Sequence, residues 1–311
     1  MNPSLLKDVT IIDTTINLPG PVAGGILASM GARVIKIEPP MGDPVSATPE
    51  LYGAINDSKE IIKIDLKKPE GQEKAKQLIA NADGILVGMR DRALKKLGLD
   101  YHSLTAINPR LVYCNVTGFP GDSNKAEHPG HDLTYLAHSG LLKTLFPDDG
   151  KIPTQLADMT GALYGALAVV SGLNYQKKNK TGISIEVNLY ESPFLLGLVP
   201  RHDPKLASSL DGGIICYRVY ETKDGKIALG ALEQKFFDSL VTAIERPEWC
   251  GQQLRPAIPG DPIFEELKSI FKSRPTAEWL SIGATHDVPI EAVNDLSFKK
   301  GLNIPFRTQI E

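Results

Sequence analysis

Three side chains in this sequence could carry protons, and each lies beside the expected start of a helix. His131 stands in PGHDLTY, Asp158 in LADMTG and Glu233 in GALEQKF. An imidazole titrates near neutral pH. A carboxylate at a helix N-terminus meets free N–H groups and partial positive charge, and the same amides could stabilise an enolate or another oxyanion.

Each of these residues also has an ordinary structural interpretation, which stays open at this point. His131 could be a histidine of a surface loop. Asp158 could be a plain N-cap, because Asp accepts a hydrogen bond from the first helical amides. Glu233 could be a charge placed favourably in the first turn of a helix.

Two basic stretches on this acidic chain could receive a polyanionic ligand. They contain Lys59, Lys63, Lys67 and Lys68, and then Arg90, Arg92, Lys95 and Lys96. Any single lysine can equally be a solvated surface charge. Arg90 is the strongest candidate, because it follows the end of a predicted strand, where ligands of parallel α/β sheets bind.

Alternating strands and helices must position these residues. A β-rich run over 9–13, a helix of small residues over 23–30 and a strand over 33–38 predict one βαβ unit with parallel strands. Further strands are predicted at 61–66, 84–87, 111–116 and 183–189, and helices at 70–80, 132–139 and 159–175. The helix over 159–175 is apolar on most sides, which predicts that it is buried. This alternation predicts an α/β fold with a large parallel sheet and flanking helices.

The second part of the chain has a different pattern, which predicts a smaller α+β domain. Asp224-Gly225 between two β-rich runs indicates a hairpin, with helices at 234–244, 262–272 and 276–282. We therefore expect a large α/β domain over 1–199 and a small domain over 214–295. The Pro-, Ser-, Asp- and Gly-rich stretch 200–213 is the expected linker, and 296–311 a shortened C-terminal segment.

Composition narrows the function classes. The 311 residues include 42% hydrophobic and 23% charged side chains with a net charge of −3, which is globular and argues against nucleic-acid binding. Three Cys without CxxC spacing predict a reducing compartment and no zinc site, and no metal is expected. No signal peptide is evident, and the longest apolar run, 161–173, is shorter than a membrane span, so a cytoplasmic protein is expected. Nucleotide, lipase and zinc-protease motifs are absent.

Taken in order, these signals resemble the class III CoA-transferase family of the CaiB/BaiF type, and most of all its α-methylacyl-CoA racemase subset. The similar stretches are LPGP at 18–21, VIKIEPP at 34–40, IDLK at 64–67, NPRLVY at 108–113, GHD at 130–132, AD at 157–158, LDGG at 210–213 and GALE at 230–233. They extend over nearly the whole chain.

The resemblance implies a CoA thioester as substrate, no separate cofactor, and two chains interlocked as a homodimer. It also implies that His131 and Asp158 are the two catalytic bases and that Glu233 is an active-site carboxylate. The CoA contacts it implies are Ile64, Asp65, Leu66, Lys67, Gly130, His131, Asp132, Leu133, Thr134 and Tyr135, with Arg90 beside a phosphate.

The expected reaction is racemisation or epimerisation of a 2-methylacyl-CoA by 1,1-proton transfer. A planar enolate needs one base on each face, and a His with a carboxylate meets that need. A CoA-transferase is the first alternative, with Asp158 as the nucleophile that forms an acyl anhydride. His131 and Glu233 would then have no obvious task, and Ile214 interrupts the glycine run that the transferases carry after Gly212-Gly213.

The second alternative is a weakly active CoA-binding partner subunit. Three positions near the expected CoA phosphates, Pro39, Asp57 and Glu60, carry less positive charge than the family pattern. The sequence also ends at Glu311, before the family's long return segment. The presence of all three catalytic-type residues argues against this alternative.

Overall fold

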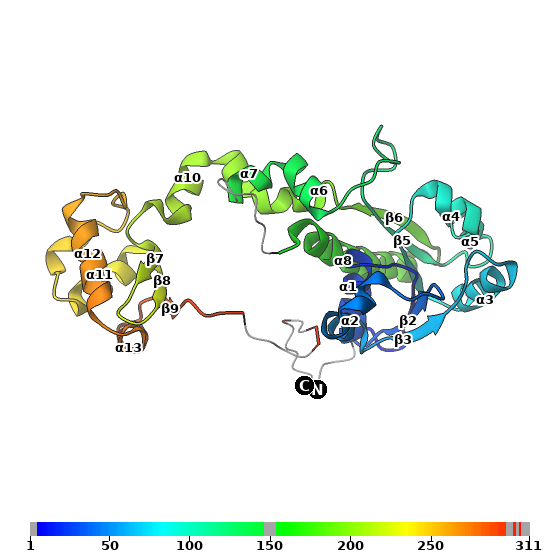
Figure 1. Ribbon diagram of the computed structural model, residues 1–311, viewed down its shortest axis with the longest axis horizontal. Coiled ribbons are helices and arrows are strands. Elements are labelled where there is room, and N and C mark those ends of the chain that lie inside the picture. The colour runs from blue at the N-terminus through cyan, green and yellow to red at the C-terminus, as the bar shows by residue number, and fades with distance from the viewer. Residues whose placement is uncertain (1–4, 146–153, 297–300, 303–304, 306–311) are drawn as a thin grey trace. The chain divides into compact units, whose positions relative to one another are not determined.

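The computed structural model describes residues 5–145, 154–296, 301–302 and 305. Contacts divide the chain into two compact units, Met1–Gly197 with Lys299–Glu311, and Leu198–Phe298 (Figure 1). Each unit has its own buried apolar core.

A six-stranded parallel sheet in the order β3-β2-β1-β4-β5-β6 forms the centre of the larger unit. The strands are β1 (Thr10–Asp13), β2 (Arg33–Glu38), β3 (Glu60–Lys63), β4 (Gly84–Val87), β5 (Val112–Thr117) and β6 (Ile183–Asn188). The predicted α/β class is confirmed. Because β1 pairs with both β2 and β4, the strand order reverses beside β1, and ligands of such sheets bind at the carboxyl ends of the strands at that point.

Helices cover both faces of this sheet (Figure 1). Alternate side chains of one strand point to opposite faces, so Ile11 packs in the core under α1 (Pro19–Ser29) and α8 (Leu156–Asn179). Ile12 packs in the opposite core. That second core is covered by α3 (Pro69–Ala80), α4 (Asp91–Leu97) and α5 (Tyr101–Thr105). The remaining elements of the unit are η1 (Pro44–Ala47), α2 (Pro49–Asn56), α6 (Asp132–Ser139), α7 (Leu141–Leu145) and η2 (Ser192–Gly197).

Helix α8 is longer and more exposed than the sequence predicted. It has 24 residues, and by length and composition alone it could cross a membrane. The apolar run 161–173, from which the sequence analysis judged this region too short for a membrane span, is only part of it. Core helices of soluble proteins meet the same criterion, and one side of α8 packs against α1 and β5. On its other side Leu163 and Leu167 are 61% and 59% exposed, which corrects the prediction of burial on most sides.

The smaller unit is an α+β arrangement around a three-stranded antiparallel sheet in the order β7-β8-β9. The predicted hairpin is present, and Thr222 N donates to Gly225 O at its turn. Phe237, Phe271 and Trp279 fill the core. The elements are β7 (Tyr217–Glu221), β8 (Lys226–Gly230), α11 (Gln234–Ala243), η4 (Pro247–Trp249), α12 (Pro262–Ser273), α13 (Thr276–His286) and β9 (Ile290–Ala292).

The stretch 200–213, which the sequence analysis expects as the linker, is helical. It holds α9 (Leu198–His202), α10 (Pro204–Ser208) and the π-helical turn η3 (Ser209–Gly213). Asp203 caps α10 by accepting from Leu206 N, and Pro204 suits the first helical position, so turn-forming residues here serve as helix starts. Most of 296–311 lies outside the described residues.

Candidate active site

A cavity of about 460 Å³ lies at the carboxyl end of the parallel sheet, where the strand order reverses. Its walls come from the loop after β1, the end of β4, the start of α6 and the first turn of α8. Four of the predicted site residues, Gly130, His131, Tyr135 and Asp158, line it together.

Asp158 is the half-buried acid of this cavity. Gln155 is the N-cap of α8, so Asp158 is the third helical residue and not the N-cap that the sequence suggested. Burial raises the pKa of its carboxyl to about 6, and the negative charge of Asp132 adds to this effect, while His131 opposes it. An acid with this pKa can both give and accept a proton near neutral pH.

The first amides of α8 are not all free for a ligand, in contrast to the sequence interpretation. Asp132, in the first turn of α6, reaches across and its Oδ1 accepts from Asp158 N at 2.9 Å. Burial raises the pKa of Asp132 as well. This bond ties the starts of α6 and α8 together and removes the Asp158 amide as an oxyanion donor.

His131 is the exposed N-cap residue of α6. Its backbone is fixed by Thr134, whose Oγ1 accepts from His131 N at 3.0 Å. One turn further, Tyr135 is buried, and burial is the main reason that its pKa rises to about 12. A Cβ at position 130 would lie 2.6 Å from the Tyr135 ring, so only glycine lets the chain pass here on its way to His131.

A second cavity of about 400 Å³ adjoins the first and shares Gly88, Gly118, Gly130 and Tyr135 with it. Arg90 lines it from the end of β4, at the strand end where the sequence placed it. Two polar atoms in its wall, Asn115 Oδ1 and Thr117 Oγ1, are buried and have no partner within the described residues. The shared walls suit an elongated ligand that occupies both cavities.

The other predicted CoA-contacting segment, 64–67, lines neither cavity. Ile64 is buried in the core under α3, and Asp65 Oδ1 accepts from Lys67 N in the turn after β3. Their contact with CoA stays a prediction. Leu133 and Thr134 are exposed on the first turn of α6.

Glu233 belongs to the smaller unit. It is the exposed N-cap of α11, directly after the edge of the hairpin, and makes no side-chain capping bond. Its predicted catalytic role stays a prediction.

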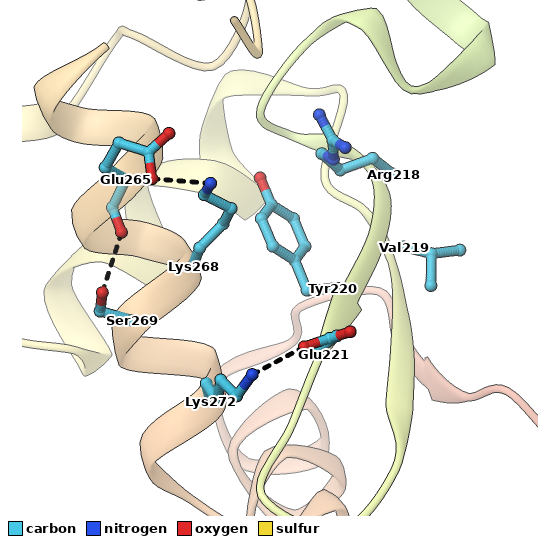
Figure 2. A pocket seen from close by; sticks show the side chains of 8 residues that line it. All are labelled: Arg218, Val219, Tyr220, Glu221, Glu265, Lys268, Ser269 and Lys272. Atoms are coloured by element: carbon cyan, nitrogen blue, oxygen red, sulfur yellow. Dashed lines mark hydrogen bonds and ion pairs between the residues drawn. The ribbon is translucent and has the colours of Figure 1, made fainter. Parts of the chain in front are cut away.

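The smaller unit has a cavity of its own, about 400 Å³, between β7 and α12 (Figure 2). Figure 2 shows that its lysines are paired. Lys268 bonds to Glu265 at 2.7 Å, and Lys272 bonds to Glu221 at 2.9 Å. Both carboxylates of this cavity are thus engaged by lysines, so the Asp158 cavity is the better candidate for proton chemistry. No cluster of potential metal ligands occurs in the part of the chain that the structure describes.

The loop after β1 is the part of the site that sequence reasoning missed. Ile16, Asn17 and Leu18 line the Asp158 cavity, although none was a predicted site residue. The sequence signal that could have identified this loop is the end of a strand at Asp13, followed by a Pro-Gly turn and a helix. The same reasoning selected Arg90 after β4.

The doubly wound parallel sheet, with an acid and a histidine in the cavity where its strand order reverses, defines an α/β enzyme. The family model for CoA-transferase family III matches residues 6–299, and the chain belongs to this family. The family indicates an enzyme that acts on CoA thioesters, either a racemase or a CoA-transferase.

Both activities occur among its relatives. Human succinyl-CoA:glutarate CoA-transferase is 27% identical over 316 residues, which cover 94% of this chain and 72% of that protein. Human alpha-methylacyl-CoA racemase is 28% identical over 296 residues, which cover 89% and 74%. The crystal structure of a CaiB/BaiF family protein from Brucella suis matches with a TM-score of 0.80 at 27% identity, over 95% of this chain and 85% of that one.

The raised pKa of Asp158 predicts that Asp158→Asn stabilises the protein at high pH. Between about pH 4 and pH 6 the folded state holds a proton that the unfolded state releases, so ionising Asp158 costs folding free energy as the pH rises. Because the carboxyl is only partly buried, we expect a gain of about 1 to 2 kcal/mol at pH 8. Urea unfolding at pH 8 and at pH 4 measures it.

The gain should shrink toward zero at pH 4. Asp122→Asn, at an exposed loop position, is the control for the loss of one carboxylate. Equal gains at the two pH values would contradict the assignment of a raised pKa to Asp158.

Proposed function

We propose that this protein is a racemase or epimerase of 2-methylacyl-CoA thioesters. The observation that carries the proposal is the common cavity of His131 and Asp158, in which the pKa of Asp158 rises to about 6. A histidine and an acid of raised pKa at one cavity are the pair of proton carriers that 1,1-proton transfer at a thioester α-carbon requires.

In the proposed reaction the α-carbon loses a proton to one of the two groups. The C–H electron pair moves into the enolate, whose oxygen takes the negative charge. The other group then returns a proton to the opposite face of the α-carbon, which inverts its configuration. Each turnover exchanges the protonation states of His131 and Asp158, and proton exchange with solvent resets them.

The second candidate is a CoA-transferase with Asp158 as the nucleophile. The observation that favours it is the similarity to succinyl-CoA:glutarate CoA-transferase, which covers as much of the chain as the similarity to the racemase. In this reaction the Asp158 carboxylate attacks the thioester carbonyl and expels the CoA thiolate, leaving an acyl anhydride.

The proton-transfer mechanism predicts that His131→Ala and Asp158→Asn each lose racemisation. Because general acid–base groups contribute about 10² to 10⁴-fold, we expect losses of that size for each variant. Chiral analysis of a 2-methylacyl-CoA incubated in deuterated water measures racemisation, and mass spectrometry measures label at the α-carbon. Each variant should still exchange the α-proton of one epimer. The control His102→Ala, an exposed histidine on α5, should keep full activity.

The same samples distinguish the two candidates. A transferase would exchange the acyl group between CoA and a free acid without α-carbon label. Hydroxylamine would also convert an acyl-Asp158 species into a modified peptide of altered mass. Such a substrate-dependent modification would overturn the racemase proposal and support the transferase.

We also propose that Arg90 binds a phosphate of CoA beside the second cavity. A charge-assisted hydrogen bond contributes about 1.5 to 3 kcal/mol. Arg90→Ala should therefore raise KM for the thioester by about ten- to a hundredfold and change kcat much less. Arg92→Ala is the matched control, because Arg92 is exposed two residues further along and lines neither cavity. An unchanged KM for Arg90→Ala would show that this side chain is only solvated.

We propose a homodimer as the functional assembly. The exposed leucines of α8, Leu163 and Leu167, lie on a helix that contacts η2, where Leu195 and Leu196 are also exposed. Apolar patches of this kind are typical of protein interfaces. Light scattering should give twice the chain mass of 33.8 kDa, and Leu163→Lys/Leu167→Lys should give the monomer mass. Leu254→Lys, at an exposed leucine of the smaller unit, should stay dimeric. A parent protein of monomer mass would contradict the proposal.

A further inference from the structure

Four charged side chains are buried in two pairs beneath the loop that follows β1. Lys36 Nζ lies 2.9 Å from Asp43 Oδ2, and Lys59 Nζ lies 3.0 Å from Asp13 Oδ2. All four side chains are completely buried. Burying an ion pair costs desolvation that the attraction between the charges often fails to recover, so stability alone does not account for these pairs.

Lys36 and Asp43 hold the backbone on both sides of Ile16. Lys36 Nζ donates to Thr15 O at 2.7 Å, and Asp43 Oδ1 accepts from Asn17 N at 3.0 Å. Asn17 has a φ of 67°, in the left-handed region that side-chain-bearing residues adopt at a cost. Asn tolerates this region better than most side-chain-bearing residues, and the pair fixes the loop on both sides of this turn of the chain.

These hydrogen bonds determine the direction in which the Ile16 N–H points. In a planar trans peptide the carbonyl oxygen and the next N–H point in opposite directions. Thr15 O faces the buried Lys36, so the N–H of Ile16 faces away from it, and Ile16 lines the Asp158 cavity. Within the described residues this N–H has no hydrogen-bond acceptor.

The second buried pair holds the neighbouring peptide groups. Asp13 Oδ1 accepts from Thr15 N at 3.0 Å, and Lys59 Nζ donates to Pro21 O at 2.6 Å. The loop from Thr15 to Pro21 is thus fixed at both ends by buried charges. A rigid, preorganised donor is the kind that stabilises developing charge without reorganisation.

We propose that Lys36 and Asp43 are positioning residues that direct the Ile16 N–H at the oxygen of the bound thioester. This inference rests on the proposed function. In racemisation that oxygen becomes the enolate oxygen when the α-proton leaves. In acyl transfer the same oxygen becomes negative when the Asp158 carboxylate adds to the carbonyl carbon. The Asp158 amide cannot take this part, because it donates to Asp132.

The test replaces both members of the pair. Removing one partner leaves the other charge buried and unpaired, which can prevent folding, whereas apolar replacement of both is tolerated. Lys36→Met/Asp43→Leu should remain folded, with a cooperative thermal transition. Loss of an oxyanion donor typically costs about 100-fold, so we expect kcat to fall by about that factor and KM to change less than about threefold.

The matched control removes an exposed pair from the same strand. Arg33 on β2 bonds to Glu60 on β3 at 2.8 Å, and both side chains are more than half exposed. Arg33→Met breaks this exposed pair and keeps Glu60, which stands near the expected CoA phosphates, so it should leave both kcat and KM unchanged. A kcat for Lys36→Met/Asp43→Leu equal to that of the control overturns the proposal.

Hydrogen exchange provides a readout that does not depend on activity. Asp43 protects the Asn17 amide in the parent protein, so this amide should exchange about tenfold faster in the double variant and at the parent rate in the control. A parent protein without racemase and transferase activity would refute the proposed function. Unchanged Asn17 exchange in the double variant would then separately overturn the positioning role.

A milder variant tests the proposal if the double variant does not fold. Asp43→Asn keeps an oxygen acceptor for the Asn17 amide but weakens the bond to Lys36. We expect a kcat loss of about tenfold with KM preserved. Unchanged kcat in Asp43→Asn would count against the proposal in the same way.

Discussion

The parallel pairing of β1 with β4 is the constraint on which the site depends. The chain leaves β1 toward one side of the sheet and leaves β4 toward the other, so the two loops diverge and open a space at the strand ends. Thr14, the residue that follows β1, links β1 to β4 at the base of this space, because both its N–H and its hydroxyl donate to Leu86 O. The cavity that contains Asp158 forms because neither of these loops passes over the ends of the two strands.

Electrostatics then divides the tasks among the acids of this end of the sheet. Asp13 is completely buried but faces two lysines, which together with hydrogen bonds hold its pKa below the ordinary value despite the opposing effect of burial. Among the described residues no lysine acts on Asp158, and burial together with the nearby Asp132 raises its pKa. The first acid therefore stays charged and structural, whereas the second can change its protonation state. The charged partners of each acid determine its role more than its depth of burial does.

Sequence patterns predicted the framework well, because strand and helix periods and Pro-Gly turns are local properties. They also selected His131 and Asp158, which follow from short motifs at helix starts. They could not identify Lys36 as buried, because the alternation in VIKIE is typical of a strand with one polar face. Burial of that face depends on contacts of Lys36 with Asp43 and with Thr15 O in the loop after β1, which the alternation within the strand does not record.

The boundary between the two adjoining cavities consists largely of backbone. Gly88, Gly118 and Gly130 contribute no side chain, and a Cβ at Gly118 or Gly130 would collide with Tyr135. The width of the passage is therefore fixed by the main chain and by one aromatic ring that cannot retreat from the core. Related enzymes usually come to accept larger or smaller substrates by exchange of side chains. At this boundary there are few side chains to exchange. New selectivity in this protein would have to arise at the far ends of the two cavities, where the walls are made of side chains.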